Sequence, residues 1–209
     1  TSLDLVKAVS KDAQDFWQQQ LGSDYVRAKV VIFTSGTQSA CGPASSAMGP
    51  FYCPLDQRVY LDLGFFKELS GRFGAPGDFA QAYVVAHELG HHVQKLVGIE
   101  GEVRKQQQES PDRANELSVR MELQADCLAG VWAGLANKMW VGMIEPGDIE
   151  GGLTAAAAVG SDRLQKAATG IVVPENFTHG SSEQRMRWFK RGFDTAQMQS
   201  CDTFTAEKL

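Results

Sequence analysis

The sequence predicts an α+β fold in which a small, mostly antiparallel sheet packs on one buried helix, next to a larger helical half. Two observations favour this fold. Short segments with alternating polarity and many aromatic and β-branched residues lie before residue 64, and such segments are typical of half-buried strands. Most later segments carry apolar residues at helical spacing. The 209 residues, of which 43% are hydrophobic, suffice for a single domain with its own core.

The individual elements follow from periodicity and from turn residues. A helix over residues 4–20 is followed by strands near 29–34, 47–52 and 58–63. Helices are then expected over 64–71, 78–97, 113–141, 147–168 and 182–197. Pro76-Gly77-Asp78 is typical of a helix start, and Gly98 is typical of a helix end. The polar stretch 104–116 indicates a solvated loop that leads into the next helix.

The helix over residues 78–97 carries the most informative motif, His87-Glu88-Leu89-Gly90-His91. Positions four apart share one face of a helix, so the two imidazoles can converge on one metal ion. Glu88 lies beside that ion and can accept a proton from water. Apolar neighbours indicate that the helix is buried, where uncompensated imidazoles and a carboxylate are unfavourable. The motif predicts one zinc ion per chain; the alternative is a structural hydrogen-bond network.

A catalytic zinc ion keeps three protein ligands and one open position. The long pattern HExxHxxGxxH is excluded, because it requires Gly at position 94 and His at position 97, where this sequence has Gln94 and Val97. Glu122 and Asp126 lie four residues apart on a later helix. We expect Glu122 to be the third ligand, and Asp126 to accept the free ring N–H of a ligand histidine. Two weaker alternatives for the third ligand lie in the polar stretch: Glu109 and Glu116.

Four separated segments resemble one known family: GPFYCPLDQRVYLDLGFF, HELGHHVQ, ELQADCLAG and FTHGSSEQRMRWFKRGF. In this order they resemble the bacterial putative neutral zinc metallopeptidases, from about Cys41 to Phe204. The resemblance implies a zincin-like fold and a gluzincin-like plan with a zinc-binding Glu and a supporting Asp. It also implies a hydrophobic N-terminal anchor. Because the sequence opens at Thr1-Ser2, we expect that anchor to be missing from it.

Peptide hydrolysis also needs a hydrogen-bond donor to the tetrahedral oxyanion. His179 is the candidate, because its position resembles a histidine that faces the substrate in gluzincin-like membrane peptidases. Arg185 is expected to orient it or to bind substrate. Alternatively, His179 is an ordinary residue before a helix, and Tyr60 or Tyr83 is the donor. His92 points about 100° away from His91 on the helix, so we interpret it as structural.

Four cysteines indicate disulfides and therefore an extracytoplasmic location, periplasmic or at the cell surface. The resemblance implies that the full-length protein is also anchored to the membrane. Of the three ways to pair them, we favour Cys41 with Cys53, across a Gly/Ser/Ala-rich loop. Cys127 would then pair with Cys201 and tie the C-terminal tail to the Glu122 helix. The alternative is four reduced, buried thiols. No CxxC spacing supports a cysteine zinc site.

A net charge of −5 argues against nucleic acid as a partner, and no apolar run reaches the roughly 20 residues of a membrane span. The leading hypothesis is a zinc endopeptidase with Glu88 as general base and a peptide or protein substrate held at a sheet edge. The alternative is a non-catalytic, zinc-stabilised domain that binds a peptide or partner, in which Glu88 would be dispensable. Hydrolysis of a non-peptide amide would use the same residues. The oligomeric state is not indicated.

Overall fold

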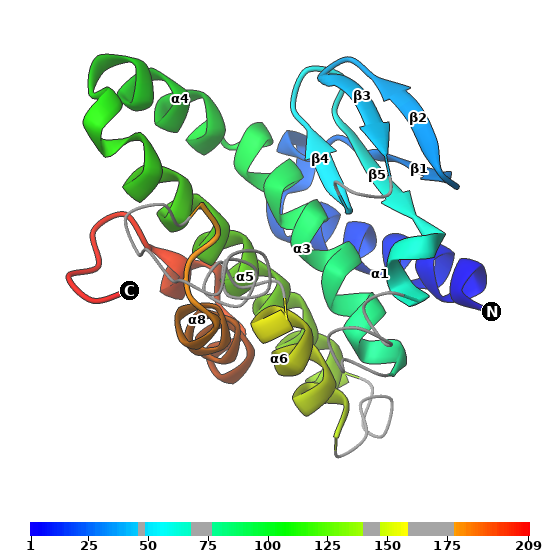
Figure 1. Cartoon of the computed structure of the whole chain (residues 1–209). Helices are drawn as coiled ribbons and strands as arrows, with labels where there is room; N and C mark the ends of the chain where they lie inside the picture. The colour runs from blue at the N-terminus through cyan, green and yellow to red at the C-terminus, as the bar shows by residue number, and fades with distance from the viewer. Residues whose placement is uncertain (46–48, 68–76, 140–146, 159–177) are drawn as a thin grey trace.

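The computed structural model describes residues 1–45, 49–67, 77–139, 147–158 and 178–209. The predicted α+β class is confirmed: a small β-structure lies at one corner of the molecule, and helices form the rest (Figure 1). The chain starts with helix α1, builds the strands, and then continues through helices to its C-terminus. The sheet therefore comes from the N-terminal third of the chain, as the sequence predicts.

Five strands make up the β-structure: β1 (Lys29–Phe33), β2 (Gly36–Ser39), β3 (Gly42–Ser45), β4 (Phe51–Cys53) and β5 (Arg58–Asp62). β5 is the central strand of a three-stranded sheet, parallel to β1 and antiparallel to β4. β2 and β3 form a separate antiparallel hairpin. β4 is thus an edge strand, and it packs against helix α3 (Figure 1).

The helices are α1 (Ser2–Leu21), α3 (Asp78–Leu96), α4 (Ile99–Glu109), α5 (Ala114–Met139), α6 (Asp148–Ala158) and α8 (Ser182–Thr195). Short 3₁₀ turns follow at Gly22–Asp24, Pro111–Arg113 and Met198–Cys201. Residues 63–67 are also helical. The expected helices are found within a few residues of their predicted ends, except that the C-terminal parts of 64–71 and 147–168 lie outside the described residues.

Two elements were not expected from the sequence. The interpretation of residues 104–116 as a solvated loop was wrong, because α4 extends over Ile99–Glu109. Its interior holds good helix formers, and one-turn pairs such as Arg104 with Glu100 support it. The β2–β3 hairpin was also missed, since its Gly, Ser and Pro residues are poor strand formers.

Helix α3 is the centre of the fold, with α1, α5, α6 and β4 packed around it (Figure 1). Nearly all of its residues from Phe79 to Gln94 are buried, and Val85, Leu89 and Val93 are inaccessible to solvent. A helix that is covered on every side must satisfy its polar side chains within the protein. The polar residues of α3 are therefore the first candidates for a functional site.

Helices α5 and α8 approach each other so closely that only glycine fits at their contact. A Cβ on Gly192 would lie 2.0 Å from the carbonyl oxygen of Cys127, and one on Gly130 would lie 2.1 Å from that of Phe189. Real Cβ atoms do not come this close to backbone. These glycines therefore set the distance between the helix that carries Glu122 and the helix that carries Arg185.

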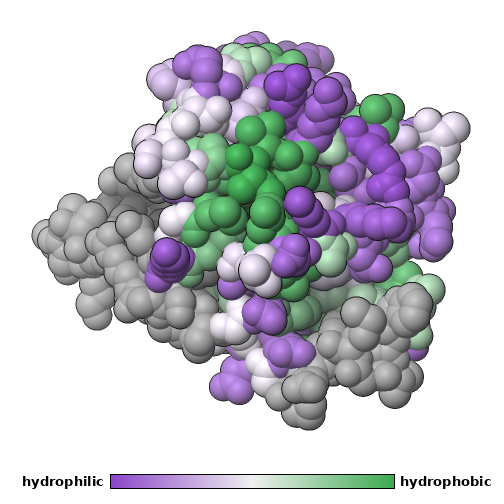
Figure 2. All heavy atoms as spheres, turned by 90° about the vertical axis from the view of Figure 1, so that its right-hand side faces the viewer, coloured by the Kyte–Doolittle hydropathy of each residue, from purple (hydrophilic) through white to green (hydrophobic). Residues whose placement is uncertain are grey.

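The face on the side where the chain begins has apolar side chains gathered near its middle, with polar ones around them (Figure 2). No helix within the described ranges is both long enough and apolar enough to span a membrane.

Candidate metal centre

Helices α3 and α5 bring two histidines and a glutamate together. The potential ligand atoms of His87, His91 and Glu122 all lie within 4.8 Å of one another. Nε2 of His87 is 3.1 Å from Oε2 of Glu122, and Nε2 of His91 is 3.3 Å from Oε1 of the same carboxylate. Two imidazole nitrogens and one carboxylate are the donor set of many zinc sites with an open position.

The glycine within the motif allows this convergence. A Cβ on Gly90 would lie 3.1 Å from the carbonyl oxygen of Ala125 and 3.3 Å from its Cα. A larger residue at this position would push α5 away from α3. Since Glu122 lies less than one turn before Ala125 on α5, Gly90 helps to bring the carboxylate within reach of the histidines.

The Nδ1 nitrogen of His87 faces a buried polar cluster. It lies 2.8 Å from Oδ1 of Asp126, which also accepts a hydrogen bond from the Tyr83 hydroxyl. Arg185, from α8, donates to both oxygens of Asp126, at 2.7 and 2.9 Å. An aspartate so engaged accepts the Nδ1–H of His87, so that in the neutral imidazole Nε2 carries the lone pair and can bind a metal ion together with Glu122.

The Nδ1 nitrogen of His91 has a different partner, which the sequence analysis did not identify. It lies 2.8 Å from Oε1 of Gln94, one turn further along α3. In both histidines of the motif, Nδ1 therefore contacts a side chain and Nε2 faces Glu122.

Glu88 and His179 lie close to this cluster without being part of the triad. Glu88 is buried on α3, makes no hydrogen bond or ion pair within the described part of the chain, and its charge acts on His91. Nδ1 of His179 is 3.3 Å from Oε2 of Glu122, and its side chain is 46% exposed. Ser181 caps α8, so His179 precedes that helix as expected and still reaches the cluster.

The other residues that the sequence singled out lie elsewhere. The Tyr60 hydroxyl donates to Asp56, and its ring stacks on Phe51 in the smaller core beside the hairpin. Tyr60 is therefore not brought to the metal cluster. Arg185 is 2% exposed, so it is placed to hold Asp126 rather than to meet a substrate from solvent. Glu116 pairs with arginines at the surface.

The structural interpretation of His92 is supported. Its Nε2–H donates to the Val26 carbonyl oxygen at 2.5 Å, and its Nδ1 accepts from the Tyr52 hydroxyl at 2.8 Å. Burial holds its pKa below the ordinary value. His92 thus connects α3 to the edge strand β4 and to the segment before β1.

The charges of the cluster fit a divalent cation. Carboxylates of Glu88, Glu122 and Asp126 lie here with one buried guanidinium, that of Arg185, which leaves two negative charges among these described groups. Burial lowers the pKa of His87, but Asp126 and Glu122 raise it by more, to about 10. Burial raises the pKa of Glu122, yet the histidines hold it well below its usual range. The negative charge that favours a proton on His87 also favours a metal cation in place of that proton, which leaves the imidazole neutral.

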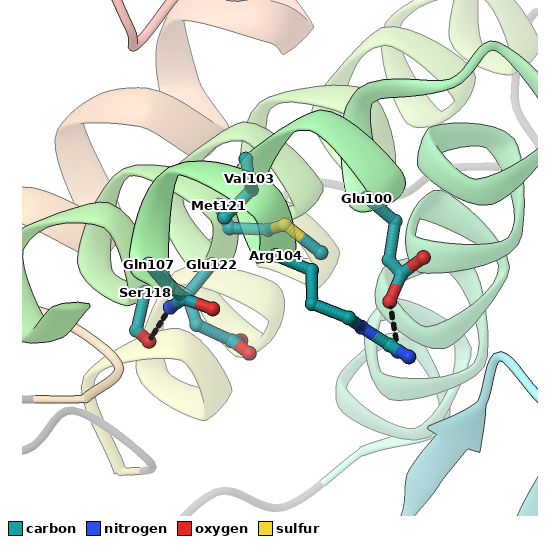
Figure 3. A pocket seen from close by; sticks show the side chains of 7 residues that line it. All are labelled: Glu100, Val103, Arg104, Gln107, Ser118, Met121 and Glu122. Atoms are coloured by element: carbon teal, nitrogen blue, oxygen red, sulfur yellow. Dashed lines mark hydrogen bonds and ion pairs between the residues drawn. The ribbon is translucent and has the colours of Figure 1, made fainter. Parts of the chain in front are cut away.

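A pocket of about 210 Å³ opens beside Glu122, between α4 and α5 (Figure 3). Its described lining residues are Glu100, Val103, Arg104, Gln107, Ser118, Met121 and Glu122. Figure 3 shows the Arg104 side chain extended towards Glu100, with which it is paired, and Gln107 bonded to Ser118. The pocket is mixed in polarity and adjoins the metal cluster through Glu122.

Both favoured disulfides are present. Cys41 bonds with Cys53, and Cys127 bonds with Cys201, so the alternative of four reduced thiols is wrong. The first disulfide ties the β2–β3 hairpin to β4, and the second ties the C-terminal segment to α5.

Comparisons with known proteins identify the family of this chain. A model of the family described as "Putative neutral zinc metallopeptidase" matches residues 1–204, and the chain belongs to this family. It is 52% identical over 195 residues to the uncharacterized protein YpfJ of Escherichia coli K12, which covers 91% of this chain and 67% of YpfJ. It is 45% identical over 213 residues to the uncharacterized protein Rv2575 of Mycobacterium tuberculosis H37Rv, which covers 98% of this chain and 71% of Rv2575. No solved structure matches significantly.

Proposed function

We propose that this protein is a zinc-dependent endopeptidase whose metal ion is held by His87, His91 and Glu122. The observation that carries the proposal is the convergence of these three ligand atoms within 4.8 Å, with Glu88 on the same helix as the two histidines. The membership of a zinc metallopeptidase family supports it.

The bound zinc ion would polarise the scissile carbonyl and lower the pKa of water towards about 7. Glu88 then has the role of general base: it accepts the proton of the attacking water and delivers it to the leaving amine. Its freedom from other described partners suits this role, because a carboxylate held by an arginine would be a weaker base. His179 is exposed enough to meet a substrate, and it donates a hydrogen bond to the oxyanion.

Asp126 and Arg185 do not bind the metal; they hold His87 in position. Asp126 accepts the Nδ1–H of His87 and keeps the Nε2 lone pair available to the metal. Arg185 compensates the charge of Asp126, and both side chains are buried beneath the ligands. Asp126 and Arg185 together carry almost no net charge. The two remaining carboxylates, Glu88 and Glu122, therefore balance the charge of the metal cation.

The edge strand β4 is the proposed binding edge for an extended substrate. Only one of its sides is paired, with β5, among the described strands. It packs against α3, to which Tyr52 and His92 fasten it. A peptide that added to β4 would run beside the metal helix and receive backbone hydrogen bonds that are independent of its sequence. The two disulfides support an extracytoplasmic location, and membrane anchoring through a further N-terminal segment completes the proposal.

Metal content and hydrolysis test the function together. The wild type is expected to hold about one zinc per chain and to cleave unfolded casein, with loss of cleavage in a chelator and recovery on zinc addition. Glu122→Ala should lose most of the metal. Glu116→Ala, an exposed glutamate on the same helix, should keep it. A wild type that binds no zinc overturns the site. Zinc binding without cleavage of unfolded proteins overturns the peptidase role and favours a zinc-stabilised binding domain.

A further inference from the structure

A chain of buried hydrogen bonds runs from His91 to the C-terminal segment. Nδ1 of His91 contacts Oε1 of Gln94 at 2.8 Å, and Nε2 of Gln94 donates to Oε1 of Gln124 at 2.9 Å. Nε2 of Gln124 then donates to the Cys201 carbonyl oxygen at 3.0 Å. Gln94 also donates to the Met121 carbonyl oxygen, at 2.9 Å. We call these hydrogen bonds from His91 through Gln94 and Gln124 to Cys201 the relay. The relay crosses from α3 to α5 and ends beside the second disulfide.

The direction of every bond in this chain is determined by its backbone end. The Cys201 carbonyl can only accept, so Gln124 must turn its NH₂ group to it and its oxygen to Gln94. Gln94 then uses both amide hydrogens, one on Gln124 and one on the Met121 carbonyl. Only its oxygen is left for His91, which must therefore carry its proton on Nδ1. In the neutral imidazole the lone pair is then on Nε2, on the side where a metal ion shared with Glu122 would bind.

Burial makes this assignment costly to reverse. Gln94 is inaccessible to solvent, Gln124 is 7% exposed and Cys201 is 1% exposed. A flipped amide would set two acceptors or two donors against each other where water cannot separate them. A glutamate at position 94 could accept from His91, but it could not donate to both acceptors. The site therefore requires a residue that accepts once and donates twice.

The far end of the chain is itself held in place. The Cys127–Cys201 disulfide fixes the segment that carries the accepting carbonyl to α5. Two hydrogen bonds between Thr203 and Arg120, each 2.5 Å, hold the same segment two residues further on. α5 also carries Glu122 and Gln124. The disulfide therefore keeps the last acceptor of the relay in a fixed position relative to Glu122, a proposed ligand of the metal.

We propose that Gln94 and Gln124 are positioning residues that hold His91 in its metal-binding tautomer, and that the Cys127–Cys201 disulfide maintains this relay. The inference rests on the zinc site of the proposed function and adds a regulator to it: zinc affinity depends on the anchoring of the C-terminal segment. His87 is supported by a charged carboxylate, whereas His91 is supported by a neutral amide whose orientation comes from a remote part of the chain.

Zinc affinity, measured by competition with a chromophoric chelator, tests the relay without relying on peptidase activity. Gln94→Met is expected to raise the zinc dissociation constant about 10- to 100-fold, and Gln124→Met to raise it by a smaller factor. Methionine matches the length of glutamine but cannot form the bonds. Gln14→Met is the matched control, because Gln14 is another buried glutamine that bonds to Ala28 and Tyr25, far along the chain from the site. It should leave the constant within about twofold.

The absorption spectrum of the Co²⁺-substituted protein gives a second readout. Gln94→Met should alter its bands, because the orientation of His91 changes, whereas Gln14→Met should not. A protein in which Cys127 and Cys201 are both alanine should bind zinc more weakly, and Gln124→Met should then have less additional effect. Removal of the other disulfide, Cys41–Cys53, is its control and should leave the affinity unchanged.

The outcomes separate the relay from the site. A wild type without zinc affinity refutes the metal site itself. If the wild type binds zinc, unchanged affinity and an unchanged Co²⁺ spectrum in Gln94→Met refute the relay, and Gln124→Met decides in the same way if Gln94→Met does not fold. An equal loss of affinity in Gln14→Met also refutes it, since a general loss of stability would then explain the effect.

Discussion

Arg185 and Asp126 form a buried, two-point ion pair between α8 and α5. The Arg185 guanidinium donates to both carboxylate oxygens, at 2.7 and 2.9 Å, and neither side chain is more than 2% exposed. Burial raises the pKa of Asp126, but Arg185 and His87 lower it by more, so that it stays below its ordinary value. The same carboxylate contacts His87. Helix α8 is thereby connected, through the Asp126 carboxylate, to a histidine of the proposed metal site.

Removal of the guanidinium should be far more costly here than at the surface. Arg185→Met leaves the buried Asp126 without its guanidinium, with only the contacts from Tyr83 and His87, and we expect a loss of about 3–5 kcal/mol in the free energy of unfolding. Lys190→Met, on the same helix, breaks an exposed pair with Asp194 and should cost at most about 1 kcal/mol. Urea unfolding of both variants measures the difference. Equal losses would mean that the buried pair contributes no more than a surface one.

The assigned role of Glu88 predicts a separation of metal binding from hydrolysis. Glu88→Gln keeps the size of the side chain but cannot accept the proton of water, so cleavage should fall by about 10²- to 10⁴-fold. Zinc content should not change, because Glu88 is not among the three converging ligands. Glu102→Gln, in the first turn of α4, is the control with unchanged cleavage. Full activity in Glu88→Gln would contradict the general-base role.

The site was predictable to the extent that helix periodicity determines it. His87 and His91 lie on one strongly periodic helix, so their shared face could be inferred from spacing. Glu122 lies on a second helix and was predicted from the ExxxD pattern and from the resemblance to a family. Tyr60 was misplaced because a strand alternates between two faces, and its hydroxyl turned out to face Asp56. α4 was missed because the surrounding segment is polar, and polarity alone does not distinguish a solvated helix from a loop.

The sequence does contain an indication that Gln94 has a specific partner. It lies on the buried helix α3, three residues after His91, where an uncharged polar residue must find a partner inside the protein. Its partners Gln124 and Met121 lie on α5, 30 and 27 residues away, and Gln124 in turn bonds to the Cys201 carbonyl oxygen. No local pattern specifies such contacts. The part of the site that depends on one helix was therefore predictable, and the part that depends on three segments was not.

The close contact between α5 and α8 predicts opposite effects for two glycine substitutions. A Cβ on Gly192 would overlap the Cys127 carbonyl oxygen, so Gly192→Ala must separate the helices and should cost at least about 3 kcal/mol. Gly101, in α4, has no neighbouring atom within 4 Å of the position that a Cβ would take, and Gly101→Ala should stabilise by up to about 1 kcal/mol. Thermal unfolding of the two variants checks both signs. A stable Gly192→Ala protein would contradict the contact.

The turn before β5 should contribute stability that depends on pH. Burial raises the pKa of Asp56, but hydrogen bonds from the Tyr60 hydroxyl and from the backbone N–H groups of Ala40 and Arg58 lower it by more, to below its ordinary value of 3.8. A carboxyl group whose pKa is lower in the folded state stabilises the fold above its unfolded pKa. That contribution is lost as the pH falls through the folded pKa.

Asp56→Asn should therefore destabilise the protein by about 1 kcal/mol near pH 7, because one of the accepting oxygens becomes an amide donor. The difference from wild type should hold down to about pH 4 and shrink below it, since the wild-type carboxyl group then becomes neutral as well. Unfolding midpoints measured from pH 7 to pH 2 test this sign, with the exposed Asp112→Asn as a control that changes stability by less than about 0.5 kcal/mol. A gap between Asp56→Asn and wild type that widens on acidification would show that the hydrogen bonds at this turn do not favour the ionised carboxylate.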